Sequence, residues 1–160
     1  MLPKTHFIIN LIISLILLKF FPGFYVLIFF LSSVLIDVDH YLFYVIEEKD
    51  FSLKNAYKWY KLNRIALKLM SREERKKHKN WVLIFHGLEP LIILFLISRT
   101  YYFFLFIFLG FLVHLVEDLF EDIPLGVAER KLFLSYAIYK HFQHKRRLNI
   151  WSIEKIKNLV

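Results

Sequence analysis

The 160-residue sequence has no cysteine. Disulfide bonds, thiolate nucleophiles and thiolate-based zinc sites are therefore excluded, and cysteine usage gives no indication of the compartment. The sequence also lacks a signal-peptide cleavage site, because its first apolar stretch ends in Lys19-Phe20-Phe21-Pro22-Gly23, without the small residues that such a site needs. We therefore expect this segment to be retained.

Charged side chains are nearly absent from four stretches of the chain. Hydrophobic residues make up 58% of the sequence and the mean hydropathy is +0.47, above the range of ordinary soluble domains. The apolar residues gather in residues 7–21, 24–36, 81–97 and 101–116. Such runs are typical of membrane helices, so the composition excludes a soluble globular domain.

The four runs pair into two predicted hairpins. Pro22 and Gly23 separate the first two runs and favour a turn, while one long kinked span over residues 7–36 is the alternative. Each arm is short compared with the roughly 20 residues of a full span, and the second arm can lengthen through residues 37–46. Arg99 lies in the short link between the last two runs.

The rest of the chain is basic. In the connector, aromatic and aliphatic residues are interleaved with lysines, which suits the headgroup interface. We predict an all-α, polytopic membrane protein with about four transmembrane helices and additional amphipathic, basic cytoplasmic helices. Its single membrane domain, 1–160, would comprise a first helical hairpin (1–46), the connector (47–80), a second hairpin (81–120) and a basic C-terminal region (121–160).

The distribution of lysine and arginine predicts the orientation. The connector and the C-terminal region together hold nearly all of these residues, whereas the two hairpin tips contain only Lys19 and Arg99. By the positive-inside rule, both termini and the connector are cytoplasmic. The net charge of +8 is then mainly a topology signal that also attracts anionic membrane lipids, and no nucleic-acid partner is expected.

Ionisable residues near the apolar runs fall into four groups, which an up-down arrangement of four spans would bring to the cytoplasmic face. Because such residues are costly at membrane depth, each is a candidate functional residue. His86 and Glu89 are three residues apart and His114 and Asp118 are four apart, so each pair shares a helix face. The other two groups are Thr5-His6 and Asp37-Val38-Asp39-His40.

Charge balance favours metal binding over packed, non-ligating histidines. Four carboxylates would lie in a poorly hydrated place: Asp37, Asp39, Glu89 and Asp118. Two divalent cations offset their charge better than histidines do at neutral pH. Imidazole and carboxylate ligands without sulfur suit Zn²⁺, with Mn²⁺ or Fe²⁺ as alternatives. In a regular helix Asp39 would point away from Asp37 and His40, so its participation requires the helix to end or distort there. The predicted ligands are His6, Asp37, Asp39, His40, His86, Glu89, His114 and Asp118.

Other polar residues are interpreted more simply. Three acidic residues follow on the helix face of His114 and Asp118: Glu117, Glu121 and Asp122. We interpret them as the solvent-exposed end of the helix; the alternative is that they contact the metal ligands. His141 and His144 lie in a basic run and are taken as surface residues.

These motifs resemble those of a prokaryotic family of membrane-bound metal-dependent hydrolases, similar in its histidines and aspartates to zinc-dependent phospholipase C. The resemblance covers residues 5–120 and rests on Thr5-His6, Asp37-x-Asp39-His40, His86 and Gly110-x₃-His114-x₃-Asp118. The chain has Ile36 where the family usually has proline and Asn10 where it often has glycine. Its third motif offers His86 and Glu89 in place of two histidines.

The resemblance implies a multi-pass protein of a prokaryotic cell membrane that holds two or three metal ions, most simply zinc. We expect hydrolysis of an amphiphilic, phospholipid-like phosphoester that reaches the site from the cytoplasmic leaflet. Asp39 or Glu89 would be the carboxylate that also acts as general base. A divalent-cation transporter or sensor and a non-catalytic membrane protein are the alternatives.

Overall fold

The computed structural model describes residues 3–76, 81–128 and 132–143, and over these ranges it contains helices and no strand. The predicted all-α class is thus confirmed. The helices are α1 (Pro3–Leu17), α2 (Gly23–Leu35), α3 (Val38–Glu48), α4 (Leu53–Leu69), α5 (Arg72–Lys76), α6 (Leu88–Ser98), α7 (Phe103–Leu125) and α9 (Leu134–Gln143).

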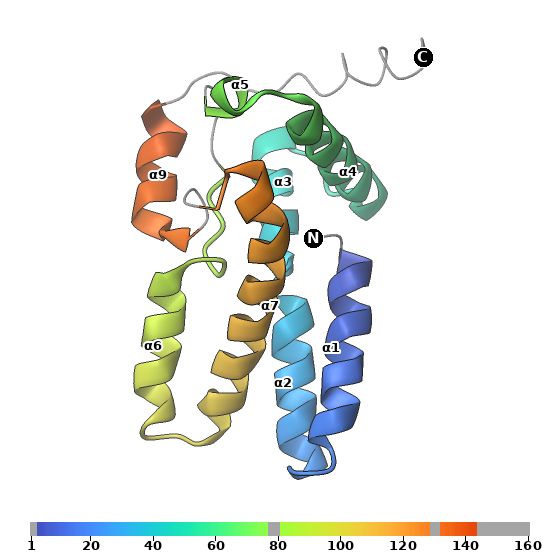
Figure 1. The fold of residues 1–160 in the computed structure, drawn as a ribbon, viewed down its shortest axis with the longest axis vertical. Helices are drawn as coiled ribbons and strands as arrows, with labels where there is room; N and C mark the ends of the chain where they lie inside the picture. The colour runs from blue at the N-terminus through green and yellow to red at the C-terminus, as the bar shows by residue number, and fades with distance from the viewer. Residues whose placement is uncertain (1–2, 77–80, 129–131, 144–160) are drawn as a thin grey trace.

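Four apolar helices stand side by side in two hairpins (Figure 1). The chain reverses between α1 and α2 at Pro22, and between α6 and α7 after Arg99, so both tips lie at the same end of the bundle. Helix α2 packs against α1 and α7, and α7 also packs against α6. The hairpin interpretation of residues 7–36 therefore applies, and the single kinked span does not.

Two stretches are long and apolar enough to cross a membrane. One is Gly23–Glu48, in which α2 runs on into α3, and the other is Phe103–Leu125, which is α7. The remaining bundle helices, α1 and α6, are apolar but shorter, with 15 and 11 residues. By length and composition, the described ranges therefore contain two candidate spans.

The long stretch is interrupted where the acidic motif begins. Helix α2 ends at Leu35 and α3 begins at Val38, with a turn at Ile36 and Asp37. This is the distortion that an inward-pointing Asp39 requires. Asp39 is accordingly buried, while Asp37 is half-buried at the turn.

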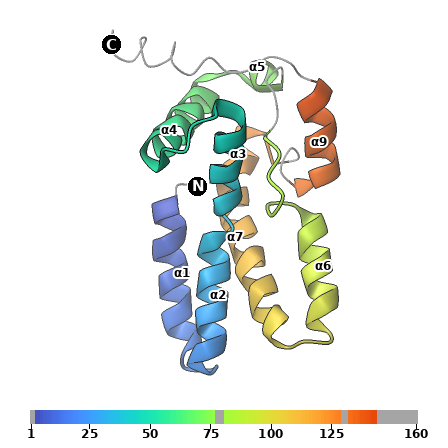
Figure 2. The ribbon, with the colours of Figure 1, turned by 180° about the vertical axis from the view of Figure 1, so that it is seen from behind.

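The connector forms a layer above the bundle. Helix α4 begins at the Ser52 cap, whose side chain accepts a hydrogen bond from the Asn55 backbone N–H. It buries residues spaced three or four apart, including Ala56, Trp59 and Leu62, against Phe43 of α3. Helices α4 and α9 flank α3 on opposite sides in both views (Figures 1 and 2). The predicted amphipathic connector is thus a helix that covers one side of α3.

Candidate metal centre

Three buried histidines from distant parts of the chain lie against one another. His6 comes from α1, His86 from the segment before α6, and His114 from α7; their exposed fractions are 1%, 0% and 0%. The His6 and His114 rings stack with centroids 4.0 Å apart, and the His86 and His114 centroids are 5.0 Å apart. The structure therefore brings together residues that are more than 100 positions apart in the sequence.

A close contact between α2 and α7 sets the position of His114. Gly110 lies so near α2 that a Cβ atom there would be 2.2 Å from Ser32 Oγ and 2.7 Å from the Phe29 carbonyl oxygen. Helices approach this closely only where small residues face each other. One turn further along α7, His114 Nδ1 consequently lies 2.7 Å from the Ser33 carbonyl oxygen.

In each of the three histidines, Nδ1 lies within hydrogen-bond distance of an acceptor oxygen of the protein. Nδ1 of His114 contacts the Ser33 carbonyl, Nδ1 of His86 lies 3.0 Å from Asp39 Oδ2, and Nδ1 of His6 contacts Glu117 Oε2. These acceptors assign the neutral tautomer, in which Nδ1 carries the hydrogen and Nε2 carries the lone pair. Acceptors of this kind commonly orient histidines that bind metals.

The Nε2 atoms converge on two aspartates. Nε2 of His86 and Nε2 of His114 are 3.2 Å apart, and Asp37 Oδ1 lies 3.5 Å from the former and 3.4 Å from the latter. Asp118 spans the other two histidines: its Oδ1 is 3.3 Å from His6 Nε2, and its Oδ2 is 3.7 Å from His86 Nε2. Lone pairs and carboxylates thus face one another in a buried place.

This arrangement needs a positive charge at its centre. Two imidazole lone pairs and a carboxylate at these distances repel one another unless a proton or a metal ion lies between them. Zinc bonds of about 2.0–2.2 Å in a tetrahedron place neighbouring ligand atoms roughly 3.3–3.6 Å apart. The separations among His86, His114 and Asp37 are 3.2, 3.5 and 3.4 Å. The residues therefore fit such an ion.

The pKa of His86 reflects the same excess of negative charge. Burial alone would lower this pKa, but the hydrogen-bonding carboxylates of Asp37 and Asp39 outweigh burial and raise the pKa to about 9. A divalent cation at the centre would offset the same negative charge and would compete with a proton for the imidazole, as expected for a histidine ligand.

Among the residues that the structure describes, three combinations bring ligand atoms within 4.8 Å of one another. They are His6 with His114 and Asp118, Asp37 with His86 and His114, and Asp39 with His40 and His86. The first two share His114 and form the centre described above. In the third, Asp39 Oδ2 accepts hydrogen bonds from His86 Nδ1 and the Phe85 backbone N–H, while Asp39 Oδ1 is buried without a hydrogen-bond partner in the described part of the chain.

His40 lies at the edge of the centre. Its Nε2 is 3.6 Å from Asp37 Oδ1, and its ring packs edge-on against His86 and Tyr60. The Tyr60 hydroxyl donates to the His40 carbonyl oxygen over 2.6 Å. Helix α4 therefore holds this part of α3 in place and closes one side of the centre.

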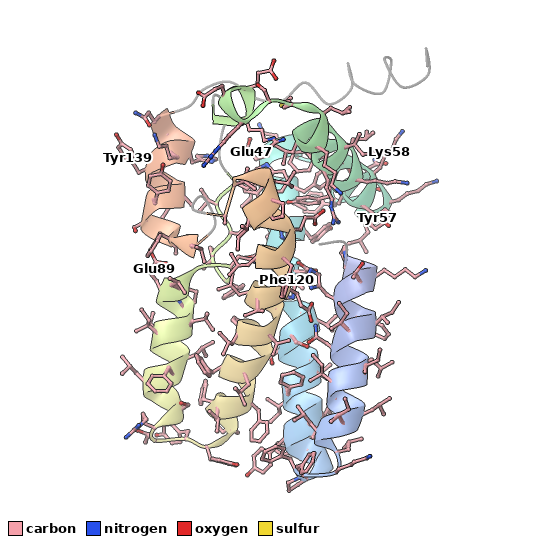
Figure 3. The ribbon with its side chains drawn as sticks, viewed as in Figure 1. Glu47, Tyr57, Lys58, Glu89, Phe120 and Tyr139 are labelled. Atoms are coloured by element: carbon pink, nitrogen blue, oxygen red, sulfur yellow. The ribbon has the colours of Figure 1, made fainter. Side chains whose placement is uncertain are left out.

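Glu89 is outside all three combinations. Its carboxylate accepts hydrogen bonds from the backbone N–H groups of Leu134 and Ser135, at 2.9 and 3.1 Å, and from the Ser135 hydroxyl at 3.2 Å. Figure 3 shows Glu89 at the junction of α6 and α9. The predicted pairing of His86 with Glu89 used helical spacing, but α6 begins at Leu88, so His86 precedes the helix. The structure thus places Glu89 as a cap of α9.

The acidic end of α7 also differs from the prediction. Glu117 and Asp122 are each only 6% exposed, so the interpretation as a solvated helix end is wrong for both. Glu121 forms ion pairs with Arg64 and Lys68 of α4. On α9, His141 lies 3.8 Å from Glu47; His144 falls outside the described residues. One signal could have drawn attention to Glu117: it follows His114 by three residues and therefore shares its helix face.

Comparisons of the chain with protein-family models, with curated proteins and with solved structures found no match. The resemblance to membrane-bound metal-dependent hydrolases consequently rests on the motif residues themselves.

Proposed function

We propose that the chain is a membrane-embedded, metal-dependent hydrolase with a centre for two divalent cations, most simply Zn²⁺. The observation that carries this proposal is the common orientation of three buried histidines. Each has Nδ1 on an acceptor and Nε2 directed toward Asp37 or Asp118. A packing role would not require all three lone pairs to face carboxylates.

The proposed ligands form two neighbouring metal-binding positions. Asp37, His86 and His114 would hold one cation, and His6 with Asp118 would hold the other. Asp118 suits a bridging role because its two oxygens face different histidines. His40 would complete the edge beside Asp37. Bound divalent cations supply a Lewis acid for a phosphoryl oxygen and lower the pKa of a bound water.

Asp39 is the best candidate for the general base. One of its oxygens orients His86, and the other is buried and has no hydrogen-bond partner among residues 3–76, 81–128 and 132–143. A buried, unpaired carboxylate oxygen is costly unless a ligand, water or proton satisfies it. Asp39 Oδ1 could therefore accept the proton of an attacking water. Glu89 is not assigned this role, because its oxygens cap α9.

A membrane setting is supported by the surface of the bundle. Helices α1 and α6 expose large apolar residues along their outer sides, such as Ile12, Leu15, Ile92 and Leu96. At about 1.5 Å per residue, α1 and α6 extend roughly 22 and 17 Å, so they would be short spans beside α2–α3 and α7. We therefore infer four membrane-embedded helices with the hairpin tips, near Lys19 and Arg99, on the outer side.

The same geometry indicates how a substrate would arrive. The centre draws residues from the start of α1, the junction of α2 with α3 and the segment before α6, and these parts lie remote from the hairpin tips (Figure 1). His40 at its edge contacts Tyr60 of α4. Helix α4 directs Tyr57 and Lys58 away from the bundle, as Figure 3 shows, and Lys54 and Lys61 are exposed on the same helix. Lysines beside exposed aromatic residues suit an anionic headgroup layer. An amphiphilic phosphoester from the cytoplasmic leaflet is thus the proposed substrate.

Transport of the cation is less well supported. On α1 the buried polar residues stop at Ser14, and on α7 residues 103–109 are apolar. A polar path toward the tips is therefore missing from the described helices.

The decisive experiment measures metal and hydrolysis together. Purified protein in detergent should retain a stoichiometric divalent ion after reconstitution with Zn²⁺ or Mn²⁺ and should hydrolyse a fluorogenic short-chain phospholipid. His114→Ala and His86→Ala should lose both properties, because each removes a ligand. His141→Ala, on α9, should retain both. Wild-type protein without stoichiometric metal would overturn the metal centre, whereas metal binding without hydrolysis of phosphoesters would overturn the substrate class.

The orientation has its own test. Reporter fusions at Arg99 and after Val160 should lie on opposite sides of the membrane, with the second one cytoplasmic. The same side for both fusions would contradict the four-helix insertion.

A further inference from the structure

One buried acidic residue touches the centre without belonging to any of its ligand combinations. Glu117 on α7 is 6% exposed, and its Oε2 contacts His6 Nδ1. Asn10 Nδ2 lies 3.4 Å from the same oxygen. The other oxygen, Oε1, is buried and has no hydrogen-bond partner in the described part of the chain.

We propose that Glu117 is a positioning residue that fixes the tautomer and the basicity of His6; this inference rests on the proposed metal centre. With Glu117 accepting the hydrogen on Nδ1, the His6 lone pair is on Nε2, which lies 3.3 Å from Asp118 Oδ1. Stacking on His114 holds the plane of the ring, with an interplanar angle of 19°. Stacking alone does not select a nitrogen, so the Glu117 carboxylate makes that selection.

Asn10 links the two helices that form this pair. Its Nδ2 donates to the His6 carbonyl oxygen over 2.9 Å and lies 3.4 Å from Glu117 Oε2. One amide thus contacts both the backbone of His6 and the acceptor of its side chain. Helix α1 is thereby held to α7 at the level of the centre.

The carboxylate also has an electrostatic effect. An ionised acceptor makes the imidazole a stronger electron donor and adds one negative charge beside Asp118, which strengthens the attraction for a divalent cation. His86 has an equivalent acceptor in Asp39. Two of the three central histidines therefore lie between a buried carboxylate and the ligand position, whereas His114 uses a backbone carbonyl.

Binding of Co²⁺ to the purified full chain in detergent tests this role without relying on catalysis. Outer-shell partners of metal-bound histidines typically contribute about 10- to 100-fold in affinity. We expect Glu117→Ala to weaken Co²⁺ binding by about this factor and to shift the visible absorption bands, because His6 is no longer oriented. Glu117→Gln, which keeps the shape but not the charge, should give a smaller loss. Glu121→Gln, one turn further along α7 and paired with Arg64, should match wild type.

A double-mutant cycle distinguishes a positioning residue from a direct ligand or a structural ion pair. In a His6→Ala background, Glu117→Gln should cause no further loss of affinity, because its effect acts through the ring. If the losses of Co²⁺ affinity in the two single variants add fully in the double variant, the proposal is overturned. It is also overturned if Glu117→Gln keeps the wild-type Co²⁺ affinity and absorption spectrum but has a lower melting temperature, since Glu117 would then be only structural. If Glu117→Ala does not fold, the Gln variant decides. Wild-type protein that binds no Co²⁺ or Zn²⁺ would instead overturn the metal centre itself.

Discussion

Helices α1 and α6 are the two short outer helices of the bundle, and they differ in what they bury. Helix α1 buries His6, Asn10 and Ser14, three polar residues at intervals of four. Between Leu88 and Ser98, helix α6 buries only Leu91. Burying a polar group is unfavourable unless it finds partners. The buried polar face of α1 begins at the candidate metal centre, where His6 and Asn10 have partners, whereas the buried side of α6 is apolar.

The acidic residues near the two helices show the same contrast. Next to α1, Glu117 faces inward and contacts His6. At the start of α6, Glu89 faces α9 and binds its first backbone N–H groups. The two sides of the bundle thus use a carboxylate for different purposes, one to orient a histidine and the other to anchor an amphipathic helix.

The largest difference is expected between Asp118 and Glu89. Asp118→Ala should lower affinity for Zn²⁺ by more than the roughly 100-fold upper value for an outer-shell residue, because both of its oxygens face histidines of the centre. Glu89→Ala should leave the affinity unchanged. Isothermal titration of purified protein, with metal content checked by mass spectrometry, makes the comparison. Equal losses in the two variants would mean that α6 contributes a ligand.

The second prediction concerns the contact that places His114. Gly110→Ala should destabilise the bundle by about 1–3 kcal/mol, because overpacking forces α7 away from α2. The added carbon would lie 2.2 Å from Ser32 Oγ. Thermal unfolding in detergent measures the effect, and metal affinity should fall with it. Gly23→Ala is a matched control, since a Cβ atom there would meet its nearest neighbour, Leu18 Cδ2, at 3.8 Å. Similar melting temperatures for both variants would contradict the close-contact explanation.

The third prediction separates anchoring from metal binding on the α6 side. Glu89→Ala should weaken the start of α9 by about 0.5–2 kcal/mol, the usual range for loss of a helix cap. Hydrogen exchange in residues 134–143 should become faster, while exchange around His114 should stay slow. Faster exchange at both places would show that α9 supports the centre as well.

Much of this architecture follows from local sequence signals. The apolar runs and the Pro22-Gly23 pair predict the hairpins, and the interval from His114 to Asp118 predicts one shared helix face. Two features depend on information that is not local. Glu89 could be assigned only once the start of α6 at Leu88 and the position of α9 were known. The burial of Glu117 depends on α1, whose His6 is 111 residues away in the sequence and contacts Glu117 only in the folded chain.

The smallest effect is expected at the end of the polar face of α1. Ser14 Oγ is buried and has no hydrogen-bond partner within the described ranges. Replacing an unsatisfied hydroxyl by a hydrogen removes a desolvation penalty, so Ser14→Ala should leave metal affinity unchanged and raise stability by up to about 1 kcal/mol. Asn10→Ala, one turn closer to the centre, should lower both, because Asn10 contacts His6 and Glu117. Thermal unfolding and Zn²⁺ titration of the two variants locate the boundary of the centre. If Ser14→Ala lowers stability, the hydroxyl has a partner such as an ordered water, and the polar region extends a further turn into the bundle.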